Sequence, residues 1–254
     1  MGIGESIQKG FGTAKKSMPL VTLLFVFGFI FNLVNVFLAP KNPDPNAAPS
    51  PALIVLGVVF IFVSIFFQAG SMGFVRDLIK NGKASMASFA SGGGKYYLRL
   101  LMLGIVVSLI IGIFVLLAAL AVAFLKDNLA PIGVVLAIFF GALGVYFVVM
   151  LFLSPYAAVV DEKTVGESIK LSMKLVKKNI GPLLGMSALL IVIGFGIGML
   201  LGAVLAGLSY AVKQELASQV VFAVLSSFVN AYLGIVVTAA FMGFYLSLAD
   251  RNNN

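Results

Sequence analysis

GESIKLSMKLVKK, residues 166–178, decides the fold of this chain, because it recurs 162 residues earlier as GESIQKGFGTAKK, residues 4–16. Both copies open with the same four letters, close on a lysine pair and precede a long apolar run. At 100° per residue, the apolar side chains of each copy fall on one helical face and the charged ones fall opposite. Each copy is therefore predicted to be an amphipathic helix of about four turns.

Long apolar runs fill most of the remaining sequence. The chain has 254 residues, of which 61% are hydrophobic and 10% are charged, more apolar surface than a water-soluble domain could bury. A run of roughly 20 apolar residues can cross the hydrocarbon core as a helix. Six transmembrane helices are predicted: Met18–Ala39, Ala52–Val75, Leu98–Leu125, Ile132–Val160, Pro182–Val212 and Ser218–Ala249. The fold class is all-α, a polytopic membrane protein with one membrane domain over residues 1–254.

The basic residues divide unevenly between the two ends of the predicted spans. One end holds 14 of the 17 Lys and Arg residues, and Lys41, Lys126 and Lys213 lie at the other. Because cytoplasmic loops are enriched in Lys and Arg, both termini are predicted to be cytoplasmic, in a cell (inner) membrane. The whole +8 charge falls on that face (14 − 6 against 3 − 3), which favours anionic membrane lipids as partners and gives no reason to expect nucleic acid.

Similar short sequence motifs at the ends of the predicted hairpins indicate an internal repeat of about 80 residues. MGFVRD at 72–77 and MGFYLS at 242–247 share Met-Gly-aromatic, and SPYAAV at 154–159 has Pro-Tyr in the matching place. Three parallel repeat units are predicted, residues 1–79, 80–162 and 163–254. Each comprises a cytoplasmic interfacial amphipathic helix followed by a transmembrane hairpin.

The middle unit has a degenerate lead-in segment, KASMASFASGGGKYYLRLL, residues 83–101. Gly92, Gly93 and Gly94 each weaken a helix by about 1 kcal/mol. We therefore expect a short helix, a bend at the glycines and then the third span.

The lysines of the two basic lead-in helices are the predicted contacts for anionic lipid or for a cytoplasmic protein partner. These helices would lie in the membrane interface. Their ammonium groups, which are opposite the apolar faces, would point toward water and headgroups. The predicted set is Lys9, Lys15, Lys16, Lys170, Lys174, Lys177 and Lys178.

Polar and small residues inside the spans have two interpretations each. Asn32, Asn35 and Asn230 would form interhelical hydrogen bonds, or would line a polar pocket open to the outer face. A ridge of small residues in the fifth span would pack closely against a helix of the bundle or of a second protomer, or would line a substrate groove. That ridge comprises Gly194, Gly198, Gly202 and Ala206.

The composition argues against most catalytic chemistry. The chain has no Cys and no His, which excludes thiolate or imidazole metal sites and a histidine general base. No charged residue lies in the middle of a span, unlike in proton pumps and most secondary transporters. Asp161, Glu162 and Glu167 are followed by lysines, which is typical of a self-neutralised helix start. No catalytic residue, metal or cofactor is therefore predicted.

SPYAAVVDEKTVGESIKLSMKLVKKNIGPLL, residues 154–184, carries a resemblance to a known group. A span ending in Pro and an aromatic, an acidic turn and a basic amphipathic helix leading into the next span resemble a group of prokaryotic six-helix membrane proteins. The group includes the membrane domain attached to some glycerophosphoryl diester phosphodiesterases and related families of unknown function. The resemblance implies a fold and a location. It carries over no catalytic residue, since the phosphodiesterase His and carboxylate signature is missing.

Two functions remain open on the sequence alone. The first is a non-enzymatic scaffold or accessory subunit in the membrane, contacting anionic lipid or a protein partner, with a homo-oligomer as one form of assembly. The alternative is a transporter or exporter of a lipid or small amphiphile, which would move its substrate through a groove between the hairpins.

Overall fold

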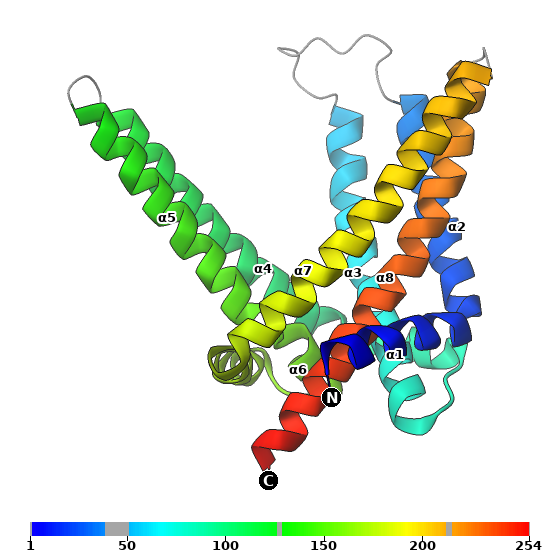
Figure 1. Cartoon of the computed structure of the whole chain (residues 1–254), viewed down its shortest axis with the longest axis horizontal. Helices are drawn as coiled ribbons and strands as arrows, with labels where there is room; N and C mark the ends of the chain where they lie inside the picture. The colour runs from blue at the N-terminus through cyan, green and yellow to red at the C-terminus, as the bar shows by residue number, and fades with distance from the viewer. Residues whose placement is uncertain (1, 39–50, 126–128, 212–214, 254) are drawn as a thin grey trace. The chain divides into compact units, whose positions relative to one another are not determined.

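All regular structure is helical in the part of the chain that the computed structural model describes, residues 2–38, 51–125, 129–211 and 215–253 (Figure 1). The helices of these ranges are α1 (Ile3–Lys16), α2 (Met18–Leu38), α3 (Pro51–Asn81), α4 (Met86–Phe124), α5 (Ala130–Leu151), α6 (Ser154–Val160), α7 (Val165–Ala211) and α8 (Glu215–Asn253). Residues 39–50, 126–128 and 212–214 lie outside the described residues. The same holds for Lys41, Lys126 and Lys213 and for the side chain of Arg251.

Six helical segments in the described ranges are long and apolar enough to cross a membrane. They are Met18–Leu38, Pro51–Asn81, Met86–Phe124, Ala130–Val160, Val165–Val204 and Ala217–Asp250. This finding fits a multi-pass membrane protein, as the sequence predicted. Several segments are longer than predicted because α3 and α4 continue into the basic connections without leaving the helical conformation, and α7 does so with one interruption at Asn179.

The contacts between residues group the chain into two compact units. The first comprises Met1–Lys95 with Gly181–Asn254, and the second comprises Tyr96–Ile180. The boundaries fall within α4 and α7, so both helices begin in one unit and end in the other. They differ from the predicted repeat boundaries at 79/80 and 162/163, which describe sequence similarity and stay a prediction.

In the first unit, α1 packs against α8 through small residues. Ser6, Ile7, Gly10 and Ala14 form the buried face of α1. A Cβ atom at Gly10 would lie 2.7 Å from the Val236 carbonyl oxygen, so only glycine permits this approach of the two backbones. Figure 1 shows α1 lying across α8 near the ends of the chain. The first and last described helices are thus held together directly.

A second close crossing joins α3 to the start of α4. A Cβ atom at Gly73 would lie 2.9 Å from the Gly92 Cα, and one at Gly93 would lie 2.6 Å from the Phe66 ring. The expected glycine bend is wrong, because α4 runs unbroken from Met86 to Phe124 through these glycines. The contacts explain the difference: the space left by the missing side chains lets α3 pack closely, which offsets the low helix propensity of glycine.

Aromatic stacking joins α2 to α3 farther along the hairpin. The Phe27 ring lies 4.1 Å from the Phe67 ring and 5.3 Å from the Phe60 ring, measured between centroids. The Phe31 and Phe60 rings are also stacked. These stacked rings supply contact between α2 and α3 along the hairpin.

In the second unit, the fourth predicted span is interrupted. Residues 132–160 were expected as one helix, but α5 ends at Leu151 and α6 begins at Ser154. Pro155 explains the break, because its ring clashes with the carbonyl one turn earlier and it has no N–H to donate. The buried Ser172 hydroxyl of α7 bridges the break, accepting a hydrogen bond from the Leu153 N–H (3.1 Å) and donating one to the Met150 carbonyl (2.7 Å).

Both basic lead-in helices end in a break just before their span. Ser17 separates α1 from α2, and Asn179 has non-helical backbone angles (φ −132°, ψ 30°) inside α7. The two side chains act alike: the Ser17 hydroxyl donates to the Thr13 carbonyl (2.8 Å) and the Asn179 amide donates to the Leu175 carbonyl (2.9 Å). Each bond satisfies a carbonyl that the end of the helix leaves without its regular partner.

The α1–α8 crossing predicts opposite effects for two nearby glycines. Gly10→Ala should lower the free energy of unfolding by about 1–3 kcal/mol, because its Cβ would overlap α8. Gly12→Ala is the matched control, since a Cβ there meets nothing within 4 Å, and should raise stability by about 0.5–1 kcal/mol through helix propensity. Apparent melting temperatures in maltoside detergent measure both. Equal stability of the two variants would contradict the crossing.

The Ser172 bridge predicts a similar contrast within one helix. Ser172→Ala should cost about 1–3 kcal/mol, because it deprives the Leu153 N–H and the Met150 carbonyl of a buried partner. Ser168 lies one turn earlier, is equally buried and has a hydroxyl with no hydrogen-bond partner among the described residues. Ser168→Ala should therefore be neutral or stabilising. Thermal unfolding of the purified variants tests the pair, and a larger loss at Ser168 would refute the bridge.

Candidate functional site

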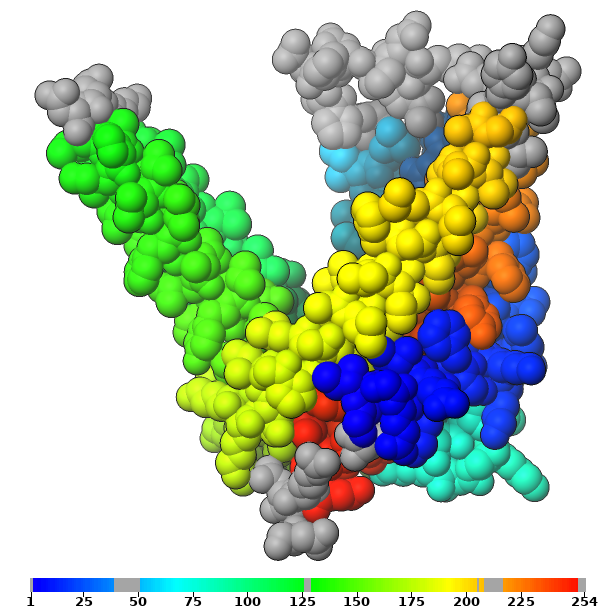
Figure 2. Space-filling view, viewed as in Figure 1, coloured from blue at the N-terminus to red at the C-terminus, as the bar shows by residue number. Residues whose placement is uncertain are grey.

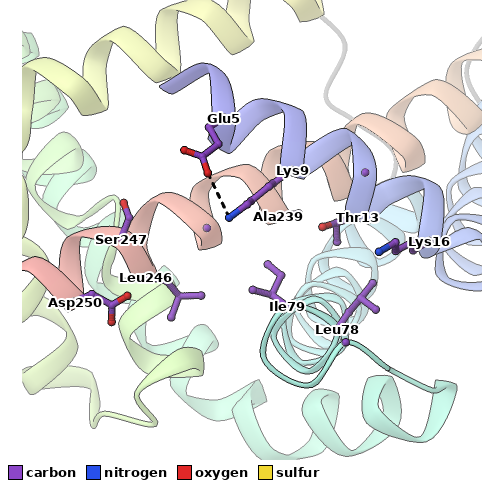
Figure 3. A pocket seen from close by; sticks show the side chains of 13 residues that line it. Glu5, Lys9, Thr13, Lys16, Leu78, Ile79, Ala239, Leu246, Ser247 and Asp250 are labelled. Atoms are coloured by element: carbon purple, nitrogen blue, oxygen red, sulfur yellow. Dashed lines mark ion pairs between the residues drawn. The ribbon is translucent and has the colours of Figure 1, made fainter. Parts of the chain in front are cut away.

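A groove of about 720 Å³ opens in the first unit between α1, the end of α3 and the end of α8 (Figure 3). Helix α1 contributes Glu5, Lys9, Gly12, Thr13 and Lys16; α3 and the following turn contribute Leu78, Ile79 and Gly82; α8 contributes Ala239, Gly243, Leu246, Ser247 and Asp250. The volume is within the range of small-molecule sites. The buried small-residue face of α1 packs on α8, and residues of its opposite, polar face line the groove.

The charges of the groove are separated along its length. Figure 3 shows Glu5, Ser247 and Asp250 toward one end, Thr13 and Lys16 toward the other, and Lys9 between them. The Lys9 ammonium lies 3.6 Å from the Glu5 carboxylate, and the two side chains are 61% and 54% exposed. An ion pair so open to water contributes little to stability. The lining therefore has two carboxylates and two ammonium groups in a dipolar arrangement.

The walls between these charged groups are apolar or small. Leu78, Ile79 and Leu246 supply aliphatic surface, and Figure 3 shows the last two side chains facing Lys9 across the groove. Gly82 has φ +71°, a backbone conformation that glycine adopts without strain, and it ends α3 at the edge of the groove. The groove is thus amphipathic, with a charged side from α1 and an aliphatic side from α3 and α8.

The structure divides the predicted lysines between two places. Lys9 and Lys16 line the groove, whereas Lys15 is exposed beside it and is not part of its lining. The remaining four are exposed on the part of α7 that belongs to the second unit: Lys170, Lys174, Lys177 and Lys178. Lipid or partner binding by this set stays a prediction.

The three predicted polar residues of the spans are not gathered into one group. Asn32 of α2 donates a hydrogen bond to the Ser227 hydroxyl of α8 (2.8 Å), as the interhelical interpretation expects. Asn35 donates to the Phe31 carbonyl of its own helix (3.0 Å), and Asn230 is exposed. None of the three lines the groove at α1.

The ridge of small residues on α7 has no close neighbour. A Cβ atom at Gly194, Gly198 or Gly202 would meet nothing within 4 Å, and Ala206 is exposed. Figure 2 shows this part of α7, in yellow, uncovered along the face in view. Packing of the ridge inside the described part of the bundle is therefore not observed, and a contact between protomers stays a prediction.

The acidic residues after the fourth span have structural partners. Glu167 accepts hydrogen bonds from the Thr164 N–H (3.0 Å) and hydroxyl (2.9 Å), a capping box that starts α7. Glu162 accepts a hydrogen bond from the Tyr96 hydroxyl (3.0 Å), and its carbonyl accepts one from Arg99 (2.9 Å). Within the described ranges, no group of three or more acidic side chains could hold a metal ion.

Comparison with family models gives one relationship. The model of a domain of unknown function, DUF7847, matches residues 1–248. The chain belongs to the DUF7847 family. The comparisons with curated proteins and with solved structures found no match. Membership of a family of unknown function agrees with the expected relationship to families of that kind. No comparison supports the expected relationship to the phosphodiesterase membrane domain.

The groove of this DUF7847 member was not predicted as a unit. Sequence reasoning singled out Lys9 and Lys16, but Thr13, Ser247 and Asp250 were not assigned to any site. Pairing between the first and last helices brings these residues together. One signal for that pairing was present: Ser6, Gly10 and Ala14 recur every fourth residue and form a small-residue ridge on α1.

A double-mutant cycle on the DUF7847 chain tests the interhelical interpretation of Asn32. Asn32→Leu and Ser227→Ala should show a coupling of about 0.6 kcal/mol, because they remove the two partners of one hydrogen bond within the spans. The matched control pairs Asn35→Leu with Ser227→Ala, which should be additive, since Asn35 bonds its own helix. Unfolding free energies in detergent give the coupling. Coupling in the control cycle alone would contradict the assignment.

Proposed function

We propose that this DUF7847 member is a non-enzymatic membrane scaffold or accessory subunit whose basic lead-in helices bind anionic lipid at the cytoplasmic surface. The observation that carries the proposal is the position of Lys15–Lys16 and Lys177–Lys178, which are exposed and lie immediately before the breaks at Ser17 and Asn179. The candidate span Met18–Leu38 begins directly after the first break, and the apolar run predicted from Pro182 follows the second. In a bilayer, that position is the level of the headgroups, where a lysine meets lipid phosphates.

The fine architecture is part of this proposal: three repeat units, each with an interfacial lead-in helix, and both termini in the cytoplasm of a cell membrane. Equal burial at matched positions supports the repeat. Ala14, Tyr96 and Val176 are 82 and 80 residues apart (96 − 14 and 176 − 96) and are at most 1% exposed. Val21, Leu103 and Leu183 have the same spacing and are at most 3% exposed.

Matched contacts give further support. Gly10, Gly92 and Ser172 also have this spacing, and each contacts the second helical arm of a hairpin. Gly10 approaches Val236 and Ala240 of α8, Gly92 approaches Ala69, Gly70 and Gly73 of α3, and Ser172 bonds Met150 and Leu153 at the end of α5. A lead-in helix packed in the same way in each unit is what an internal triplication predicts.

A scaffold is favoured over the other function classes. Catalysis would need a cluster of reactive side chains, and transport would need a polar path through the spans. The Asn32 amide instead bonds Ser227 between helices, and the charged groove lies at the α1 end of the unit. Neither of these two observations specifically supports the transporter function. The resemblance to the phosphodiesterase membrane domain adds only an expected fold and location.

Lipid selectivity at the protein surface tests the proposal. In bilayers of phosphatidylcholine with phosphatidylglycerol, spin-labelled phosphatidylglycerol should associate with the wild-type chain more strongly than labelled phosphatidylcholine. Replacing Lys15, Lys177 and Lys178 with Gln should reduce that preference several-fold at low salt, because each basic residue near an anionic surface contributes about 1 kcal/mol. Replacing the same residues with Arg should preserve it, and high salt should weaken it.

A charge-matched control separates position from net charge. Lys80, Lys83 and Lys163 are exposed lysines away from the two breaks, and replacing them with Gln removes the same +3. This control should lose much less of the preference. An equal loss in both triple variants would mean that overall charge, rather than the lysines at the breaks, attracts the lipid, and the proposal would fail.

A further inference from the structure

We propose that the groove between α1, α3 and α8 binds a zwitterionic amphiphile that carries a phosphate and a primary ammonium group, as a phosphoethanolamine lipid does. The juxtaposition that carries this inference is a pair of lysines and a pair of carboxylates arranged along one amphipathic groove of about 720 Å³, with Lys9 between Glu5 and Lys16 (Figure 3). The lysines at the breaks attract anionic lipid in general. The groove, in contrast, selects one headgroup by its two opposite charges.

The basic part of the groove fits a phosphate. Lys16 and Thr13 lie toward one end and Lys9 lies near the middle, so that two ammonium groups and a hydroxyl can all donate to phosphate oxygens (Figure 3). Lys9 has a long, water-exposed contact of 3.6 Å to Glu5. Such a contact is weak, and the Lys9 side chain can exchange it for a charge-assisted hydrogen bond to a ligand.

The acidic part of the groove fits a primary ammonium. Glu5 and Asp250 present carboxylates from two different helices, with the Ser247 hydroxyl beside Asp250 (Figure 3). Carboxylates accept hydrogen bonds from an –NH₃⁺ group, whereas a trimethylammonium group has no N–H to donate. Quaternary ammonium sites use aromatic faces, and none of the described lining residues is aromatic. The chemistry therefore favours ethanolamine over choline.

The aliphatic wall indicates a ligand with a carbon chain. Leu78, Ile79 and Leu246 lie opposite the charged face of α1, and Ala239 and Gly243 leave room between them. A small soluble zwitterion would leave this surface in water, but the first methylenes of an acyl chain would cover it. The groove also lies at the ends of two candidate membrane spans, α3 and α8, where a lipid headgroup is available.

The inference shares only Lys16 with the lysines at the breaks. Lys15, Lys177 and Lys178 are absent from the groove lining, and the groove belongs entirely to the first unit. Loss of the surface preference for phosphatidylglycerol would leave headgroup selection in the groove unaffected. Failure of either proposal can therefore be recognised separately.

Equilibrium binding of matched lysophospholipids tests the groove. The full chain in maltoside detergent is titrated with lysophosphatidylethanolamine, lysophosphatidylcholine or lysophosphatidylglycerol of one chain length, and bound lipid is counted by native mass spectrometry. The ethanolamine lipid should bind at least about fivefold more tightly than the other two, because only it satisfies both charged ends. Binding of either of the other two lipids within twofold of the ethanolamine lipid would overturn the headgroup assignment. O-phosphoethanolamine binding as tightly as the lipid would overturn the amphiphile assignment.

Three variants test whether the lipid headgroup binds in this groove. Gly12→Phe should abolish the preference, because its side chain extends into the groove from a position where a Cβ meets nothing within 4 Å. Glu5→Gln combined with Asp250→Asn should bring the ethanolamine lipid to the affinity of the choline lipid and leave phosphatidylglycerol binding intact or tighter. Lys163→Gln removes an exposed lysine outside the groove lining; it is the control and should leave the preference for the ethanolamine lipid unchanged.

The variants also exclude a folding artefact. Each variant must elute from a size-exclusion column as the wild type does and must melt within a few degrees of it. The open space around Gly12 allows the Gly12→Phe variant to meet this condition. A well-folded Gly12→Phe variant that still prefers the ethanolamine lipid overturns the proposal. An unchanged preference in the Glu5→Gln, Asp250→Asn variant overturns the assignment of the ammonium end.

Discussion

Close approach of helix backbones at small residues is the constraint on which the described packing depends. Helices in lipid gain little from burying apolar surface against one another, because the lipid tails are equally apolar. Contact must come from dispersion over short distances, and a side chain larger than hydrogen at Gly10, Gly70 or Gly73 would prevent it. These crossings fix where α1 lies on α8 and where α4 leaves α3. They thereby determine the width of the groove and the face of α1 that lines it.

Hydrogen bonds have a different task in this chain. They repair the backbone where a helix is interrupted, as Ser172 does at the break before Pro155 and as Ser17 and Asn179 do at the ends of the lead-in helices. Unpaired backbone groups are costly where water is scarce, so each break needs such a partner. Small residues therefore set the distances between helices, and serines and asparagines permit the changes of direction.

The sequence predicted the spans well because length and hydropathy are local properties. It failed at the glycines of α4, where local propensity indicated a bend but contact with α3 decides the conformation. It also predicted one continuous helix over 132–160, whereas the structure has a two-residue break just before Pro155. The groove escaped prediction for a related reason: Asp250 and Glu5 are close in space only because the two ends of the sequence pair. Of its charged residues, Lys9 and Lys16 alone were foreseen as functional.

The pairing of α1 with α8 has a consequence for the order of events during synthesis. Gly10 and Ala240, which meet in this crossing, are separated by 230 residues (240 − 10). At about 5–20 residues per second, α1 waits roughly 10–50 s for its partner to be made. Its charged face lets it wait in water or at a membrane surface, whereas an apolar helix would have to insert. The mixed composition of α1 thus suits an element that is made well before the helix on which it docks.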